Sequence, residues 1–276
     1  MKTLVAGCSY TENAAWPQHL LPGHTILNTG IAAAGNTYIS NSVLYNLDFK
    51  PDFVFVLWSG INRVDFRVPK SKFFAGDSGT YRTVDVGEST YMLSGHSVDT
   101  DRGWLAGYNA IKADHWPEIS SLDDWFKLSP EIKAECLQHR IYLSSHGGKE
   151  NADAYCHQYF VTQCLEENKK YQSEITFQNM LTCFSVLDKL KIPYRFGFIY
   201  DIWSKNLIKS QGQAIKNKYH DLIDWEKFIN LPPFNFGIKH DYLSSDQFHL
   251  TDEGMLAWAD NIQVILKKDP ELKHLF

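Results

Sequence analysis

The chain has 276 residues, of which 44% are hydrophobic and 21% are charged. These fractions are close to the averages of folded globular proteins, so they exclude a disordered, collagen-like or disulfide-scaffold chain. The chain has 27 Lys and Arg against 32 Asp and Glu, so its net charge is -5 and no excess of positive charge is available for a nucleic-acid partner. No apolar run approaches the roughly 20 residues that cross a bilayer, so we expect no membrane span.

The cysteines and the amino terminus bear on the compartment. Five cysteines stand at positions 8, 136, 156, 164 and 183, an odd number without a regular framework, as is typical of reduced thiols. Residues 5–8 resemble the end of a lipoprotein signal, but the seven residues that precede Cys8 are too few for a basic and an apolar stretch. We therefore expect a cytoplasmic protein whose first residues form a buried strand.

The first 65 residues predict alternating strands and helices. Residues 36–47 carry Ile39, Val43 and Leu47 at helical spacing, and the six apolar residues at 53–58 are typical of a strand buried on both faces. The expected strands are 3–6, 25–28 and 53–58, and the expected helices are 14–21 and 36–47.

The carboxy-terminal part continues the same alternation. A helix over 173–190 has Phe177, Leu181, Phe184 and Leu187 on one stripe, a strand follows at 194–199, and a last helix begins near Thr251. Strands that alternate with helices predict an α/β three-layer sandwich around a central, mostly parallel sheet.

Residues 66–171 show weak periodicity and are rich in aromatic residues and glycine. We interpret them as an insertion, a cap or lid over the active site, within a core formed by 1–65 and 172–276. Cys136 and His139 have a spacing that suits zinc, but the other cysteines and histidines nearby are irregularly spaced. We therefore prefer core thiols and surface histidines, and we expect no metal.

Polar residues that suit catalysis stand just beyond three strands and before the last helix. They are Ser9, Gly35, Asn36, Asn62, Asp246 and His249. Because ligands bind beyond the carboxyl ends of parallel strands, the positions of these residues predict a single site.

At these residues the chain resembles the SGNH hydrolases, also called GDSL esterases. Four short blocks occur in the family's order: GCSYT at 7–11, GNT at 35–37, GIN at 60–62 and DQFH at 246–249. The resemblance covers 1–65 and 172–276 and implies a flavodoxin-like SGNH fold. It also implies an esterase that needs no cofactor.

The chemistry of ester cleavage explains these residue types. Ser9 would attack the carbonyl while His249 takes its proton, and Asp246 would orient the imidazole. The resemblance implies an oxyanion hole made of the backbone N–H groups of Ser9 and Gly35 and the side-chain amide of Asn62. Removing one such donor costs on the order of 100- to 1,000-fold in rate.

The sequence departs from the family pattern at two positions and leaves other interpretations open. Cys8 stands where the family has an aspartate, and Arg63 replaces the aspartate that commonly follows the third block. Arg63 suggests an anionic or sugar-like substrate.

Cys8 as the nucleophile is the less favoured alternative, because strand neighbours point to opposite faces, and we expect it to be a buried thiol. Ser9 as a helix N-cap and a second pair, His240 with Asp241, are further alternatives.

The predicted function is hydrolysis of a carboxylic ester through an acyl-Ser9 intermediate. Aromatic rings in the insertion favour a carbohydrate O-acetyl ester, so the expected partner is a small-molecule or glycan ester. The alternatives are an acyltransferase with the same triad and a non-catalytic carbohydrate-binding or structural module that keeps the fold. The sequence predicts no oligomeric state.

Overall fold

The structure is a computed structural model of the chain. It describes residues 1–12, 14–60, 63–69, 82–86, 89–97, 115, 117, 127–129, 131–132, 165–201, 218–219, 221–245 and 248–276.

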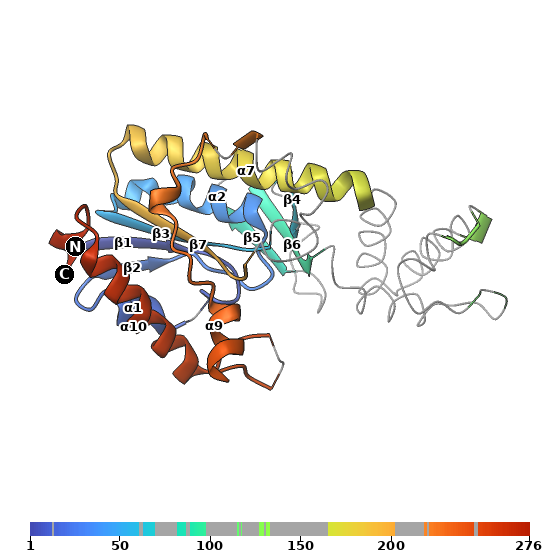
Figure 1. Ribbon diagram of the computed structural model, residues 1–276. Coiled ribbons are helices and arrows are strands. Elements are labelled where there is room, and N and C mark those ends of the chain that lie inside the picture. Colours follow the sequence, from blue (N-terminus) through green and yellow to red (C-terminus); the bar gives the residue numbers. More distant parts are fainter. Residues whose placement is uncertain are drawn as a thin grey trace.

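A four-stranded parallel sheet forms the centre of the fold (Figure 1). Its strands are β1 (Lys2–Ala6), β2 (Thr25–Asn28), β3 (Phe53–Trp58) and β7 (Tyr194–Phe198), in the order β2-β1-β3-β7. Every residue of β3 is buried, as its continuous apolar sequence predicts. This strand order is that of flavodoxin-type folds. From β1 the chain first adds β2 on one side and then β3 and β7 on the other, so the order reverses between β1 and β3.

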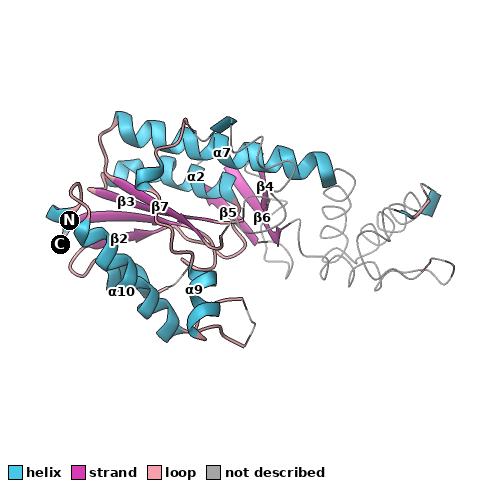
Figure 2. Cartoon of the chain, in the orientation of Figure 1, coloured by secondary structure: helices cyan, strands magenta, loops and turns pink. Residues whose placement is uncertain are grey.

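Helices cover both faces of this sheet (Figure 2). On one face α2 (Asn36–Tyr45) packs against α7 (Leu165–Lys189), and on the other α1 (Trp16–Leu20) packs against α10 (Asp252–Lys268). The expected α/β sandwich is therefore confirmed. A further helix, α9 (Pro233–His240), precedes α10 and was not predicted from the sequence. The remaining short helices are η1 (Asn46–Phe49), η4 (Trp225–Lys227) and η5 (Lys273–Leu275).

A second, antiparallel sheet follows β3 in the chain. Its strands are β4 (Arg63–Pro69), β5 (Arg82–Val86) and β6 (Ser89–Ser97), in the order β4-β6-β5. Strand β4 contacts α2 and crosses the boundary that we expected between residues 65 and 66. The division into a core and an insertion stays a prediction.

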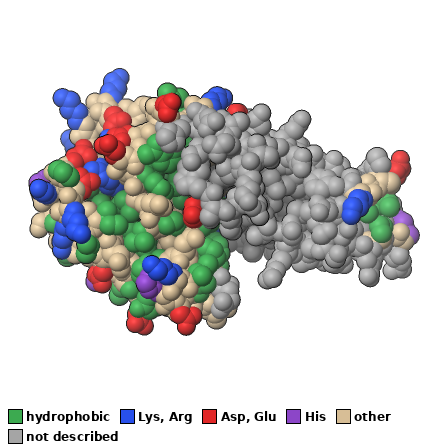
Figure 3. Space-filling model, in the orientation of Figure 1, with side chains coloured by type: hydrophobic (Ala, Val, Ile, Leu, Met, Phe, Trp, Pro, Cys, Tyr) green, Lys and Arg blue, Asp and Glu red, His purple; other side chains and the backbone are tan. Residues whose placement is uncertain are grey.

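Helix α7 begins at Leu165, earlier than the predicted start at 173. The additional residues are mostly Glu, Lys and Gln, which have high helix propensity but no apolar stripe to reveal them. No described helix is both long and apolar enough to cross a membrane. On the face shown in Figure 3, acidic and basic side chains are interspersed over the described part, with hydrophobic side chains between them.

Aromatic side chains lock α1 and α10 onto the sheet. The Trp16 ring meets the rings of Phe55 and Trp258 edge to face, with centroid distances of 5.5 and 5.1 Å. All three side chains are buried. Helix α10 begins after Thr251, whose hydroxyl accepts the backbone N–H of Gly254 at 3.1 Å and so caps the helix. This packing fixes both the turn after β1 and the start of α10, which flank the candidate site.

Candidate active site

Ser9 lies in the turn that follows β1, at the point where the strand order reverses. Ala6 of β1 pairs with Val56 of β3, so the residues after both strands meet at one edge of the sheet. The backbone N–H groups of Thr11 and Glu12 donate to the Cys8 carbonyl at 2.8 and 3.0 Å and close the turn. Ligands of open parallel sheets bind in the crevice at this kind of reversal.

Glycines allow the turn to be this tight. A Cβ atom built on Gly7 would lie 2.1 Å from the Thr11 hydroxyl oxygen, and one on Gly30 would lie 2.5 Å from the Thr11 Cβ. Thr11 itself is fully buried between them. The first glycine of the nucleophile block is therefore required for close packing behind Ser9.

His249 lies in the loop between α9 and α10, close to the start of α10. Its carbonyl accepts the backbone N–H of Ser244 at 2.7 Å, and Leu243 pairs with Leu250 in an antiparallel bridge. These contacts give the loop a defined shape. The ring nitrogen Nε2 of His249 lies 2.7 Å from the Ser9 hydroxyl oxygen.

The Ser9–His249 contact has the geometry of a nucleophile and its base. Transfer of a proton between them requires a heavy-atom distance of about 2.6–3.2 Å. When Nε2 is unprotonated it accepts the hydroxyl proton, which turns a weak nucleophile into an effective one. Both side chains are partly buried, so the pair stays accessible to a substrate.

Asn36 connects the second and third blocks. Its side chain is buried, its Oδ1 accepts the backbone N–H of Ser59 at 2.9 Å, and its Nδ2 donates to the carbonyl of Gly60 at 3.1 Å. Nδ2 also donates to the Thr176 hydroxyl on α7 at 3.1 Å. Asn36 therefore holds the segment beyond β3 beside the start of α2.

Gly35 precedes α2, and its backbone N–H is engaged by a carboxylate. It donates to Oδ1 of Asp65 at 2.7 Å, and the backbone N–H of Tyr38 donates to Oδ2 at 2.9 Å. Asp65 thus caps the α2 amino terminus from β4, and a Cβ on Gly35 would lie 2.8 Å from both carboxylate oxygens. An oxyanion would have to share this N–H with Asp65, so the oxyanion role of Gly35 stays a prediction.

Burial of the Asp65 carboxyl raises its pKa from 3.8 to about 7. The hydrogen bonds from Tyr38 and Gly35 and the nearby Arg63 charge oppose this rise without cancelling it. Arg63 also donates from Nη1 to the Ala34 carbonyl at 3.3 Å. Arg63 and Asp65 together hold the segment that leads into α2, and the substrate role expected for Arg63 stays untested.

Several predicted residues lie outside the described part of the chain. They are Asn62, Asp246, Cys136 and His139. Their expected roles stay predictions. Among the residues that the structure describes, no three His, Cys, Asp or Glu side chains are grouped as a metal ion would require.

The structure places the residues of two of the three alternatives. Cys8 is fully buried, as expected of a core thiol. His240 is exposed at the end of α9, where its ring packs on Phe236 at a centroid distance of 4.4 Å. The histidine that meets Ser9 is His249 and not His240.

Sequence reasoning missed two residues that shape this site, Asp65 and Tyr10. The pattern of charged and apolar residues at 63–67 alternates with period two and would have predicted the strand that carries Asp65. Tyr10 directly follows Ser9, and its hydroxyl donates to the carbonyl of Phe248, beside the base. Nothing in the sequence indicates this contact.

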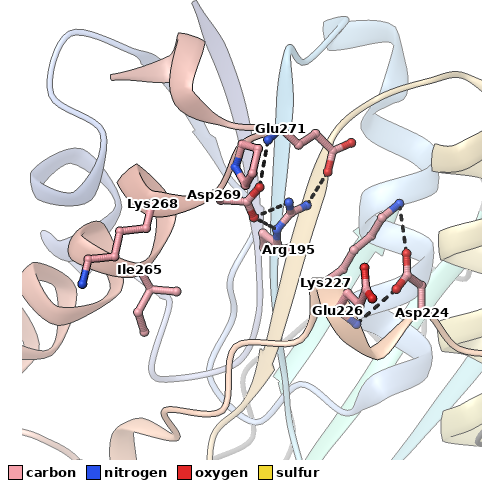
Figure 4. A pocket seen from close by; sticks show the side chains of 9 residues that line it. Arg195, Asp224, Glu226, Lys227, Ile265, Lys268, Asp269 and Glu271 are labelled. Atoms are coloured by element: carbon pink, nitrogen blue, oxygen red, sulfur yellow. Dashed lines mark hydrogen bonds and ion pairs between the residues drawn. The ribbon is translucent and has the colours of Figure 1, made fainter.

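A pocket of about 470 Å³ lies at the opposite end of the sheet (Figure 4). Arg195, near the start of β7, donates to the carboxylates of Asp269 and Glu271 and to the Tyr194 carbonyl. Lys227, which also lines the pocket, pairs with Asp188 at 2.8 Å. These charges are paired within the protein. We therefore interpret the ion pairs of Arg195 as contacts that hold the carboxy-terminal segment against β7.

Comparisons with known proteins assign no family to the chain. No model of a protein family matches it, and no curated protein matches it significantly. The resemblance to SGNH hydrolases therefore rests on the four blocks and stays a proposal.

Proposed function

We propose that the protein is a serine esterase of the SGNH type, which hydrolyses a carboxylic ester through an acyl-Ser9 intermediate. The observation that carries the proposal is the 2.7 Å contact between the Ser9 hydroxyl and His249 Nε2. It joins residues 240 positions apart in the chain, and it lies at the strand-order reversal where parallel sheets bind ligands.

The proposed reaction begins when Ser9 Oγ attacks the ester carbonyl and its proton passes to His249 Nε2. The tetrahedral intermediate collapses to the acyl-enzyme, and the departing alcohol takes the proton from His249. A water molecule then attacks the acyl carbon and gives its proton to His249. The second intermediate collapses, Ser9 recovers the proton, and the carboxylic acid leaves.

Asp246 and Asn62 have the roles that the resemblance implies, orientation of His249 and stabilisation of the oxyanion. The backbone N–H of Ser9 is a further oxyanion donor in this proposal, and the reaction uses no cofactor. For the substrate, we infer an O-acetyl group on a carbohydrate, because aromatic residues are frequent in 66–171 and such rings stack on sugar faces.

A fluorophosphonate probe tests the nucleophile, and p-nitrophenyl acetate tests the reaction. The wild type should become labelled on Ser9 and release p-nitrophenol, whereas Ser9→Ala and His249→Ala should do neither. Cys8→Ala is the control for the neighbouring thiol and should still be labelled. A folded wild type that takes up no probe, or labelling that persists in Ser9→Ala, would refute the proposal.

A further inference from the structure

Tyr10, the residue after the nucleophile, is fixed to the core. Its side chain is fully buried, and the indole N–H of Trp16 donates to its carbonyl at 2.8 Å. Trp16 is in turn packed between Phe55 of the sheet and Trp258 of α10. Tyr10 is therefore a rigid point beside Ser9.

The Tyr10 side chain reaches the loop that carries the base. Its hydroxyl donates to the carbonyl of Phe248, 238 residues away in the chain. Its ring centroid lies 5.7 Å from that of Phe248 and 5.2 Å from that of His249. One side chain thus makes a polar contact and two ring contacts with the loop.

The base needs such an anchor because it lies on neither a helix nor a strand. The bonds from Ser244 to His249 and from Thr251 to Tyr242 connect the loop to its own two ends, so they fix its shape. They do not set its distance from Ser9. A displacement of about 1 Å at a catalytic group can cost on the order of 100-fold in rate.

We propose that Tyr10 is a positioning residue, whose hydroxyl bond to the Phe248 carbonyl holds His249 at hydrogen-bonding distance from Ser9. The inference rests on the proposed esterase function, since it assigns Tyr10 a role in the same site. In this proposal Tyr10 takes no part in bond making, and its effect acts through the position of the imidazole.

The test compares Tyr10→Phe with Tyr38→Phe. Tyr38 is a matched control, because it is also buried and its hydroxyl also donates to a backbone carbonyl, that of Thr29 at 3.1 Å. Both variants lose one buried hydroxyl contact. Tyr10→Phe should lower kcat for p-nitrophenyl acetate roughly 10- to 100-fold with KM unchanged, whereas Tyr38→Phe should keep the wild-type kcat.

An NMR measurement keeps the proposal testable if the protein turns over no ester. The ring Cε1–Hε1 signal of His249, assigned with His249→Gln, reports the surroundings of the imidazole. It should move in Tyr10→Phe and in Ser9→Ala, but not in Tyr38→Phe. If the signal stays at the wild-type position in a folded Tyr10→Phe, the positioning role is refuted. If the signal moves in Tyr10→Phe but the wild type takes up no fluorophosphonate, only the esterase proposal is refuted.

Discussion

The Asp65 carboxyl makes the stability of this protein depend on pH in a direction that can be worked out. Its two oxygens accept the backbone N–H groups of Gly35 and Tyr38, and burial raises its pKa from 3.8 to about 7. The substitution Asp65→Asn removes the titrating group and keeps nearly the same shape. One amide N–H then faces an NH₂ group, which costs about 1 kcal/mol at every pH.

The sign follows from the protons bound in each state. Between pH 3.8 and about 7 the folded protein keeps a proton on Asp65 that the unfolded chain has lost. The free energy of unfolding therefore falls as pH rises through this interval, and it is flat on either side. A difference of about three pH units, at about 1.4 kcal/mol per unit, gives at most about 4 kcal/mol.

Urea unfolding followed by tryptophan fluorescence measures this effect across that pH interval. The stability of the wild type minus that of Asp65→Asn should fall by up to about 4 kcal/mol from the acid to the neutral end. The control Asp48→Asn changes an exposed carboxyl and should keep the wild-type pH profile. A wild-type minus Asp65→Asn difference that stays constant with pH would show that the carboxyl does not titrate as reasoned.

Three other predictions concern the base, the ion pairs of Arg195 and a helix cap. His249→Ala should reduce p-nitrophenyl acetate turnover on the order of 10⁴-fold or more, because no group then takes the Ser9 proton, and equal activity would contradict this. Arg195→Ala should lower the free energy of unfolding by about 3 kcal/mol in urea, because two carboxylates lose a buried counter-ion. Thr251→Ala should cost about 1 kcal/mol in the same assay, since Gly254 N–H loses its acceptor, and an unchanged midpoint would refute the capping role.

The sequence by itself determined the fold class, because the evidence for it is local. Six buried apolar residues in a row define β3, and the predicted strands at 25–28 and 53–58 coincide with β2 and β3. Polar residues beyond the strands and just before the last helix also nominated Ser9 and His249. Elements without regularly spaced apolar residues, such as the first turns of α7, were not predicted, since helix propensity alone carries a weak signal.

Only the tertiary structure decided which candidates meet. His240 and His249 are both near the carboxy terminus, yet the loop after α9 brings His249 alone of the two to Ser9. Asp65 reaches the Gly35 N–H across 30 residues, and Tyr10 reaches Phe248 across 238. Such contacts depend on how sheet, helices and loops pack together, and no local pattern encodes a distance between segments so far apart in the chain.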